Sequence, residues 1–235
     1  MSRTLEICAA SLPSALAAQA GGAHRIELCQ NLEQGGIKPS YGLLRQVLAR
    51  VSLPVFGLIR PRPGGFVYSA DELAIMHDDV EMCRELGCAG VVLGVLDAAG
   101  HVDIAACQDL LKIAGDMAVT FHRAFDACAD QAEALEAVVA LGCQRVLTSG
   151  GQATAVAGQA QLAALVAQAA GRLQIMPGAG ISAENIRALA AATGAREFHA
   201  SAKRQRPAEA AAGLFGVAQW ETDATLVAEL VVALG

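Results

Sequence analysis

The stretch Leu5-Glu6-Ile7-Cys8 has a near copy one unit later, Ile26-Glu27-Leu28-Cys29. In both copies, bulky apolar residues alternate with a carboxylate and a thiol, which is the period-two pattern of a β-strand. Helix-like segments follow both copies, and this order indicates parallel βα units whose strands are covered on both faces. We therefore expect Glu6 and Glu27 to point into a barrel interior or a site. The alternative is a pair of edge strands with both glutamates in water.

The same alternation of strand-like and helix-like segments continues along the chain, eight times in all. Strands are predicted at 5–9, 26–30, 55–60, 91–96, 119–125, 146–149, 173–176 and 197–201. Helices are predicted at 11–20, 40–50, 70–86, 104–114, 131–141, 155–170, 183–192 and 224–234. Eight βα units in 235 residues predict one α/β domain, a (β/α)8 TIM barrel over residues 1–235. A doubly wound open sheet is the alternative.

A repeated glycine favours the barrel. Gly22, Gly87, Gly142 and Gly194 each begin a segment in which a small residue and two variable residues lead to a β-forming residue. Each glycine is placed to end a helix. They precede the second, fourth, sixth and eighth predicted strands, a periodicity that suits a closed barrel and has no reason to occur in an open sheet. The longest irregular stretch, 202–223, is expected to be a lid or a subunit contact.

Composition excludes several classes of protein. The net charge is −6, from 17 Lys and Arg against 23 Asp and Glu, and no basic run is interleaved with aromatic residues, so nucleic acid is not an expected partner. No apolar run approaches the ~18 residues that span a bilayer, so no membrane is expected either. The 54% hydrophobic content predicts a homo-oligomer, with a dimer favoured.

Seven cysteines at irregular spacings indicate reduced thiols rather than a disulfide framework. The first residues lead directly into a strand without the features of a signal peptide. Both observations predict a cytoplasmic protein.

Chemistry in a barrel belongs at the carboxyl ends of the strands. The alternation of apolar residues predicts that the polar residues of the strands face inward: Glu6, Cys8, Glu27, Cys29, Arg60, His122, Gln174, Met176, His199 and Ser201. Two structural explanations stay open. A lone histidine in a barrel is often a hydrogen-bonded core residue, and the glutamates can pair with arginines across the barrel.

Two glycine-rich loops belong to the same rim. Thr148-Ser149-Gly150-Gly151 follows the sixth predicted strand, and Pro177-Gly178-Ala179-Gly180 follows the seventh. Glycines there let backbone N–H groups face an anion such as a phosphate, and Lys203 and Arg204 follow the eighth strand. Turn geometry alone also explains such glycines.

A set of motifs across the chain carries a resemblance to a known family. They are Glu6-Ile7-Cys8, Ile26-Glu27-Leu28-Cys29, residues 31–40, residues 59–66 with Tyr68-Ser69, Phe121-His122-Arg123-Ala124-Phe125-Asp126, residues 147–151 and residues 177–181. In combination they resemble the CutC family. The resemblance implies a TIM barrel, a cytoplasmic and oligomeric protein, and a role in copper homeostasis.

Copper is therefore the expected metal. Intracellular Cu(I) prefers soft thiolate ligands. Cys8 and Cys29 occupy matching positions of neighbouring predicted strands, about 5 Å apart, and are the predicted ligands. Met176, His122 and His199 are candidates to complete the site. The other five cysteines are expected to be small buried hydrophobes.

An enzyme is the competing hypothesis, with lyase or isomerase chemistry on a small anionic or phosphorylated substrate. Glu6, Glu27 and His122 are the candidate acid/base residues. The candidate substrate-binding residues are Arg60, Arg123, Asp126, Ser149, Gly150, Gly151, Gly178, Gly180, His199 and Ser201. The sequence alone does not decide between a copper ion and a small anionic ligand.

Overall fold

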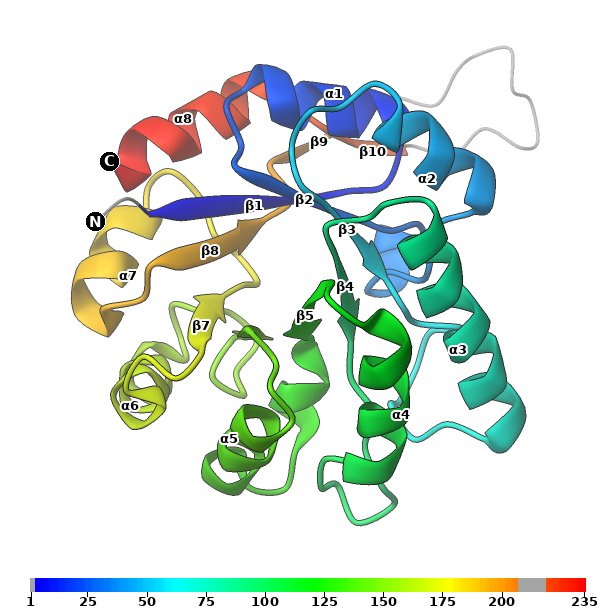
Figure 1. The fold of residues 1–235 in the computed structure, drawn as a ribbon. Helices are drawn as coiled ribbons and strands as arrows, with labels where there is room; N and C mark the ends of the chain where they lie inside the picture. The colour runs from blue at the N-terminus through cyan, green and yellow to red at the C-terminus, as the bar shows by residue number, and fades with distance from the viewer. Residues whose placement is uncertain (1–2, 207–218) are drawn as a thin grey trace.

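Parallel strands surrounded by helices form a TIM barrel in the computed structural model, which describes residues 3–206 and 219–235 (Figure 1). The barrel strands are β1 (Thr4–Ala9), β2 (Arg25–Leu28), β3 (Val55–Leu58), β4 (Gly90–Leu93), β5 (Ala118–Phe121), β6 (Arg145–Thr148), β7 (Gln174–Pro177) and β8 (Glu197–Ala200). All eight predicted strands are present, and the predicted fold is confirmed.

The order of the strands is β7-β6-β5-β4-β3-β2-β1-β8. β1 pairs with β2 on one side and with β8 on the other, which brings Glu6 opposite His199. Within the described residues no hydrogen-bonded ladder joins β7 to β8. The barrel is therefore nearly closed, with a seam between its seventh and eighth strands.

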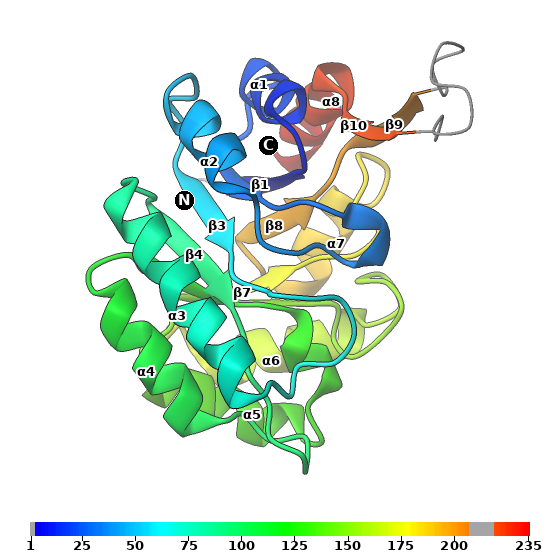
Figure 2. The ribbon, with the colours of Figure 1, turned by 90° about the vertical axis from the view of Figure 1, so that its right-hand side faces the viewer.

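Helices cover the outside of the strands (Figures 1 and 2). They are α1 (Leu12–Ala20), α2 (Tyr41–Leu48), α3 (Ala70–Glu85), α4 (Ile104–Ala114), α5 (Gln131–Ala140), α6 (Gln159–Ala169), α7 (Ile186–Thr193) and α8 (Ala224–Leu234), with short 3-10 turns η1 (Leu32–Gln34) and η2 (Arg123–Ala127). Local signals explain where several begin. Ser69 and Glu72 form a capping box at α3, and the Asp103 side chain caps α4. None of the described helices is both long and apolar enough to cross a membrane.

Successive side chains of each strand point alternately toward the helices and toward the barrel interior, which gives the barrel two separate apolar clusters. Leu5, Ile7, Ile26 and Leu28 belong to the large apolar core that the helices share with the strands. Inside the barrel, a smaller apolar cluster contains Cys8, Cys29, Phe56, Leu58 and Val92. The parity predicted from the sequence is thus the one observed, and it turns carboxylates and thiols inward.

A short antiparallel hairpin follows the barrel, formed by β9 (Lys203–Arg206) and β10 (Gln219–Thr222) (Figure 2). The sequence predicted only an irregular stretch over 202–223, so these strands are a correction. Lys203 Nζ lies 4.7 Å from the centre of the Trp220 ring, which helps hold the two strands together. The part of the predicted lid at 207–218 lies outside the described residues.

Candidate functional site

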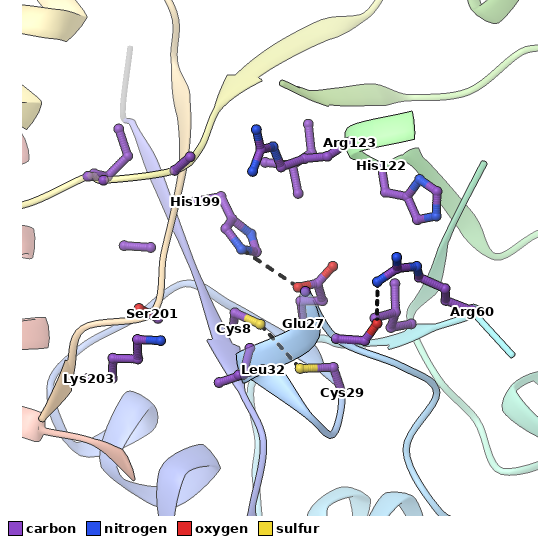
Figure 3. A pocket seen from close by; sticks show the side chains of 18 of the residues that line it. Cys8, Glu27, Cys29, Leu32, Arg60, His122, Arg123, His199, Ser201 and Lys203 are labelled. Atoms are coloured by element: carbon purple, nitrogen blue, oxygen red, sulfur yellow. Dashed lines mark hydrogen bonds and ion pairs between the residues drawn. The ribbon is translucent and has the colours of Figure 1, made fainter. Parts of the chain in front are cut away.

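A cavity of about 360 Å³ opens at the carboxyl ends of the strands (Figure 3). Strands β1, β2 and β8 supply Cys8, Glu27 and His199, and Cys29 directly follows β2. The segments that follow the strands contribute the remaining predicted residues of the lining, which are Arg60, His122, Arg123, Gly180 and Ser201. The structure thus brings most of the predicted polar residues to one pocket.

A network of buried charges lies beneath this pocket. Arg25 Nε lies 2.5 Å from Glu6 Oε2, and Arg25 Nη2 lies 2.6 Å from Glu197 Oε2, which also accepts from Arg145 Nε at 3.1 Å. Burial alone would raise the pKa of Glu6, but Arg25 and His199 outweigh burial and lower this pKa to about 2. Glu6 is therefore ionised and is not itself part of the pocket lining.

His199 connects the network to the pocket. Its Nδ1 lies 2.7 Å from Glu6 Oε1, and its Nε2 lies 3.6 Å from Glu27 Oε2. Burial alone would lower the pKa of His199, but Glu27, Cys8 and Glu6 together raise it well above the ordinary 6.5. His199 is accordingly an imidazolium that bridges two carboxylates. Burial raises the pKa of Glu27, so its pKa is shifted in the direction opposite to that of Glu6.

The two thiols of the pocket touch each other. Cys8 Sγ lies 3.3 Å from Cys29 Sγ, and both residues are buried. Their backbone positions differ from the prediction, because Cys8 is opposite Glu27 and Cys29 lies beyond the end of the ladder. The thiols meet along a diagonal. Cys8 Sγ also belongs to a cluster with Glu27 and His199 whose ligand atoms all lie within 4.8 Å of one another.

Met176 and His122 were candidates to complete a metal site, and the structure places both away from the thiols. Met176 Sδ accepts from Arg25 Nη2 at 3.3 Å, within the buried network. His122 lines the pocket, but it stands on the side of Arg60, away from the thiols (Figure 3). Its ring centre lies 5.0 Å from that of Phe66. Burial and the charge of Arg60 lower the pKa of His122 to about 3, so its ring is neutral near pH 7.

The loop after β6 is filled by a carboxylate of the chain itself. Asp126 accepts hydrogen bonds from the N–H groups of Ser149 and Gly151 and from the hydroxyls of Thr148 and Ser149. Arg123 donates to both Asp126 and Ser149. These donors hold an internal anion where the sequence predicted a bound substrate. Asp126, Ser149, Gly150, Gly151 and Gly178 lie outside the lining of the cavity.

Sequence reasoning missed three residues of the buried network: Arg25, Arg145 and Glu197. Each is the first residue of its strand. Arg25 and Glu197 stand two positions before the predicted inward residues Glu27 and His199, so the same parity pointed to them. No inward residue of β6 was predicted, so parity did not point to Arg145. The Arg25 and Arg145 guanidinium groups lie 5.1 Å and 5.0 Å from the centre of the Phe56 ring. Both also donate to Glu197 Oε2, so one carboxylate and one aromatic ring stabilise two like charges inside the barrel.

Known proteins match the chain along most of its length. The sequence model of the CutC family matches residues 3–204. A CutC family protein of Xylella fastidiosa strain Temecula1 is 57% identical over 203 residues, covering 86% of this chain and 76% of that protein. One of Xanthomonas campestris pv. campestris strain B100 is 57% identical over 199 residues, covering 85% of this chain and 83% of that protein.

Solved structures agree with the barrel. CutC of Streptococcus agalactiae, a protein named for copper homeostasis, superposes with a TM-score of 0.80 at 35% identity, covering 85% of this chain and 98% of that one. Phosphoribosylanthranilate isomerase of Thermotoga maritima superposes with a TM-score of 0.62 at 14% identity, covering 100% of this chain and 98% of that one. The second likeness shows the fold alone.

Proposed function

Because this chain belongs to the CutC family, we propose that it acts in copper homeostasis by binding Cu(I) between Cys8 and Cys29. The observation that carries the proposal is the 3.3 Å separation of the two buried sulfurs. Thiolate sulfur is the ligand that a soft ion such as Cu(I) prefers, and two or three such ligands suffice. The copper homeostasis protein of Streptococcus agalactiae is similar to this chain over most of its length.

The donor set fits a metal ion. Metal–thiolate bonds are about 2.3 Å long for zinc, so two sulfurs on one ion can lie up to about 4.6 Å apart. The observed separation of 3.3 Å is shorter than that limit, so the two sulfurs would move apart by up to about 1.3 Å to hold an ion between them. Glu27 and His199 are near enough to Cys8 to supply a further ligand. His199 must lose a proton to do so, because its ring is held as an imidazolium between Glu6 and Glu27.

Protons compete with the metal at this site. The hydrogen bond shared with Cys29 and burial raise the pKa of the Cys8 thiol, so Cys8 is protonated in the free site. Binding as thiolate releases protons, and we expect the apparent affinity for Cu(I) to fall as the pH falls.

The test is a Cu(I) titration against a competing chelator. Replacing Cys8 and Cys29 together with Ser is expected to remove most of the affinity, because a hydroxyl is a poor ligand for a soft ion. The matched control replaces Cys83 and Cys88, a second buried pair of neighbouring thiols outside the pocket. Unchanged affinity in the Cys8/Cys29 variant, or equal loss in the control, would contradict direct copper binding here.

A second candidate function is catalysis, with lyase or isomerase chemistry on a small anionic or phosphorylated substrate. One observation favours it: the cavity of about 360 Å³ is far larger than an ion requires, and it exposes Glu27 beside an imidazolium. Glu27 would act as the acid/base, with Glu6 setting the charge of His199. A thermal-shift panel of organic acids and sugar phosphates tests whether the cavity takes anions, and absence of any shift would remove this candidate.

The compartment and the assembly are part of the proposal. We place the protein in the cytoplasm, because all seven cysteines are free and six of them are buried, as in reducing compartments. Its partners would be a copper ion or a small anionic ligand, without nucleic acid or membrane. We also expect a homo-oligomer, with a dimer favoured, and the mass measured by light scattering in dilute solution tests this.

A further inference from the structure

We propose that the wall of the pocket formed by His122, Arg60 and Phe66, here the His122 corner, binds the carboxylate group of a small organic acid. The inference rests on the second candidate function, in which the cavity takes a small anion. It adds the chemical class of the ligand and the atoms that recognise it.

The tautomer of His122 is fixed by the backbone. The N–H of Ala124 donates to His122 Nδ1 at 3.2 Å, so Nδ1 carries a lone pair. The ring is neutral, and its proton must therefore be on Nε2. His122 is 4% exposed, and Nε2 has no hydrogen-bond partner among the described residues. A buried N–H donor without an acceptor is costly, and because His122 is part of the cavity lining, a ligand in the cavity is the candidate acceptor.

Arg60 supplies a buried positive charge that no carboxylate of the described chain neutralises. Its Nη1 donates to the carbonyl of Gly36 and its Nη2 to that of Gly64, which fixes the guanidinium in place. Arg60 is 6% exposed, and its Nε has no partner in the described structure. Backbone carbonyls satisfy donors without supplying a negative charge. A buried cation of this kind is stabilised by a bound anion.

The two side chains that carry the unpartnered donors both pack against one aromatic ring. The Phe66 ring lies 5.0 Å from the His122 ring and 5.1 Å from the Arg60 guanidinium. A carboxylate presents two oxygens on a flat, singly charged group, and two N–H donors beside an aromatic ring match it. A phosphate would bring more oxygens and more charge than two donors can satisfy. The corner therefore suits a carboxylate better than a phosphate.

The space for this arrangement depends on Gly94. A Cβ at Gly94 would lie 2.6 Å from His122 Nδ1, so only glycine lets the imidazole lie in this position. On the far side of the pocket, Ser201 and Lys203 are separated from the His122 corner by the thiols and Glu27 (Figure 3). If the carboxylate of a ligand lies in the His122 corner, the rest of the ligand would therefore extend past Glu27 toward Ser201 and Lys203.

Calorimetric titration of the full chain with pyruvate, malonate and inorganic phosphate tests the inference. We expect the carboxylates to bind, and His122→Phe and Arg60→Gln each to weaken them about tenfold to hundredfold, as the loss of a charged hydrogen bond does. His122→Gln keeps an N–H donor and should restore part of the affinity. Lys112→Gln removes the same charge from an exposed side chain outside the cavity lining, so it is the matched control for general electrostatic attraction and should change affinity less than about threefold.

A measurement on the unmodified protein covers the case in which a variant fails to fold. Nitrogen-15 spectra should show His122 as the neutral Nε2–H tautomer, and its Nε2–H proton should shift when malonate is added. A proton on Nδ1, or no shift at saturating malonate, would overturn the inference. Binding of phosphate alone would overturn the carboxylate assignment but would still support an anion-binding cavity. Binding of none of the three probes would remove both.

Discussion

His199 Nδ1 lies 2.7 Å from Glu6 Oε1, and this contact directs the other nitrogen of the ring toward Glu27. A line of alternating charges thus runs from Arg25 inside the barrel through Glu6 and His199 to the carboxyl that faces the pocket. The charge of Glu27 consequently depends on His199, which lines the pocket, and in part on Glu6 and Arg25, which lie outside the lining. This arrangement, and the contacts of Gly94 and Asp126 near the pocket, predict how mutation and pH change the stability of the protein.

Replacing Glu6 with Gln should destabilise the fold. The substitution removes the buried negative charge that pairs with Arg25 and His199. The free energy of unfolding at pH 7 should therefore fall by about 3 kcal/mol. Urea unfolding followed by circular dichroism measures the change. Glu81→Gln is the control, since Glu81 pairs with Arg84 at the surface and should alter stability very little. A Glu6→Gln variant as stable as the wild type would contradict the account of the network.

The stabilising effect of Glu6 should depend on pH. Its pKa is about 2 in the folded chain and ordinarily about 4.5, so its contribution is fully present above about pH 4.5 and is lost as the pH falls toward about 2. His199 stays protonated over that range, because its pKa is raised. The difference in unfolding free energy between wild type and Glu6→Gln should therefore shrink with acidification. A difference that is constant from neutral to acid pH would count against an ionised Glu6.

Gly94→Ala should disturb the His122 ring. The added Cβ would meet Nδ1 and Cε1 of that ring, break the hydrogen bond from Ala124, and cost about 1–3 kcal/mol of stability. Gly42→Ala is the matched control, because nothing lies within 4 Å of a Cβ at that helical position, and there alanine should stabilise by about 0.5–1 kcal/mol. Thermal unfolding compares the two variants. Equal effects would show that the imidazole adapts freely.

Asp126→Ala should open the loop after β6 to external anions. The N–H groups of Ser149 and Gly151 lose their acceptor, and we expect a loss of about 2–4 kcal/mol. Phosphate should then raise the melting temperature of this variant more than that of the wild type, because it can replace the missing carboxylate. Asp109→Ala removes an exposed carboxylate and serves as the control. No selective rescue by phosphate would mean that the loop collapses rather than stays open.

The fold was predictable because its signals are local. Apolar alternation located the strands, and glycines such as Gly22 and Gly142 marked the ends of helices before strands. Two helix starts were misplaced: α6 begins at Gln159 and not at residue 155, and α7 begins at Ile186 and not at residue 183. Before α7, a start after Ser182 was expected, but the helix begins after Asn185, whose side chain accepts from the Ser182 N–H. Both residues suit a cap, and only the path of the preceding loop decides between them.

The sequence predicted which residues form the site better than it predicted which of them contact each other. The alternation of side chains along each strand placed Glu27, Cys8 and His199 inside the barrel, because successive side chains of a strand point to opposite faces. It did not reveal that Cys8 meets Cys29 along a diagonal, which depends on strand register. Nor did it reveal that Asp126 fills the Gly150 loop, since that contact joins segments brought together only by the tertiary fold.

The seam between β7 and β8 has a consequence for synthesis. Because β8 is held by β1 and not by β7, the last barrel strand must pair with the first, as Glu6 does with His199. On the ribosome, β1 therefore keeps one unsatisfied edge, and Glu6 lacks its histidine, until nearly the whole chain has emerged. Such long-range closure is slow, and an open strand edge invites pairing with other chains. Newly made copies should thus be most prone to aggregate just before β8 leaves the exit tunnel.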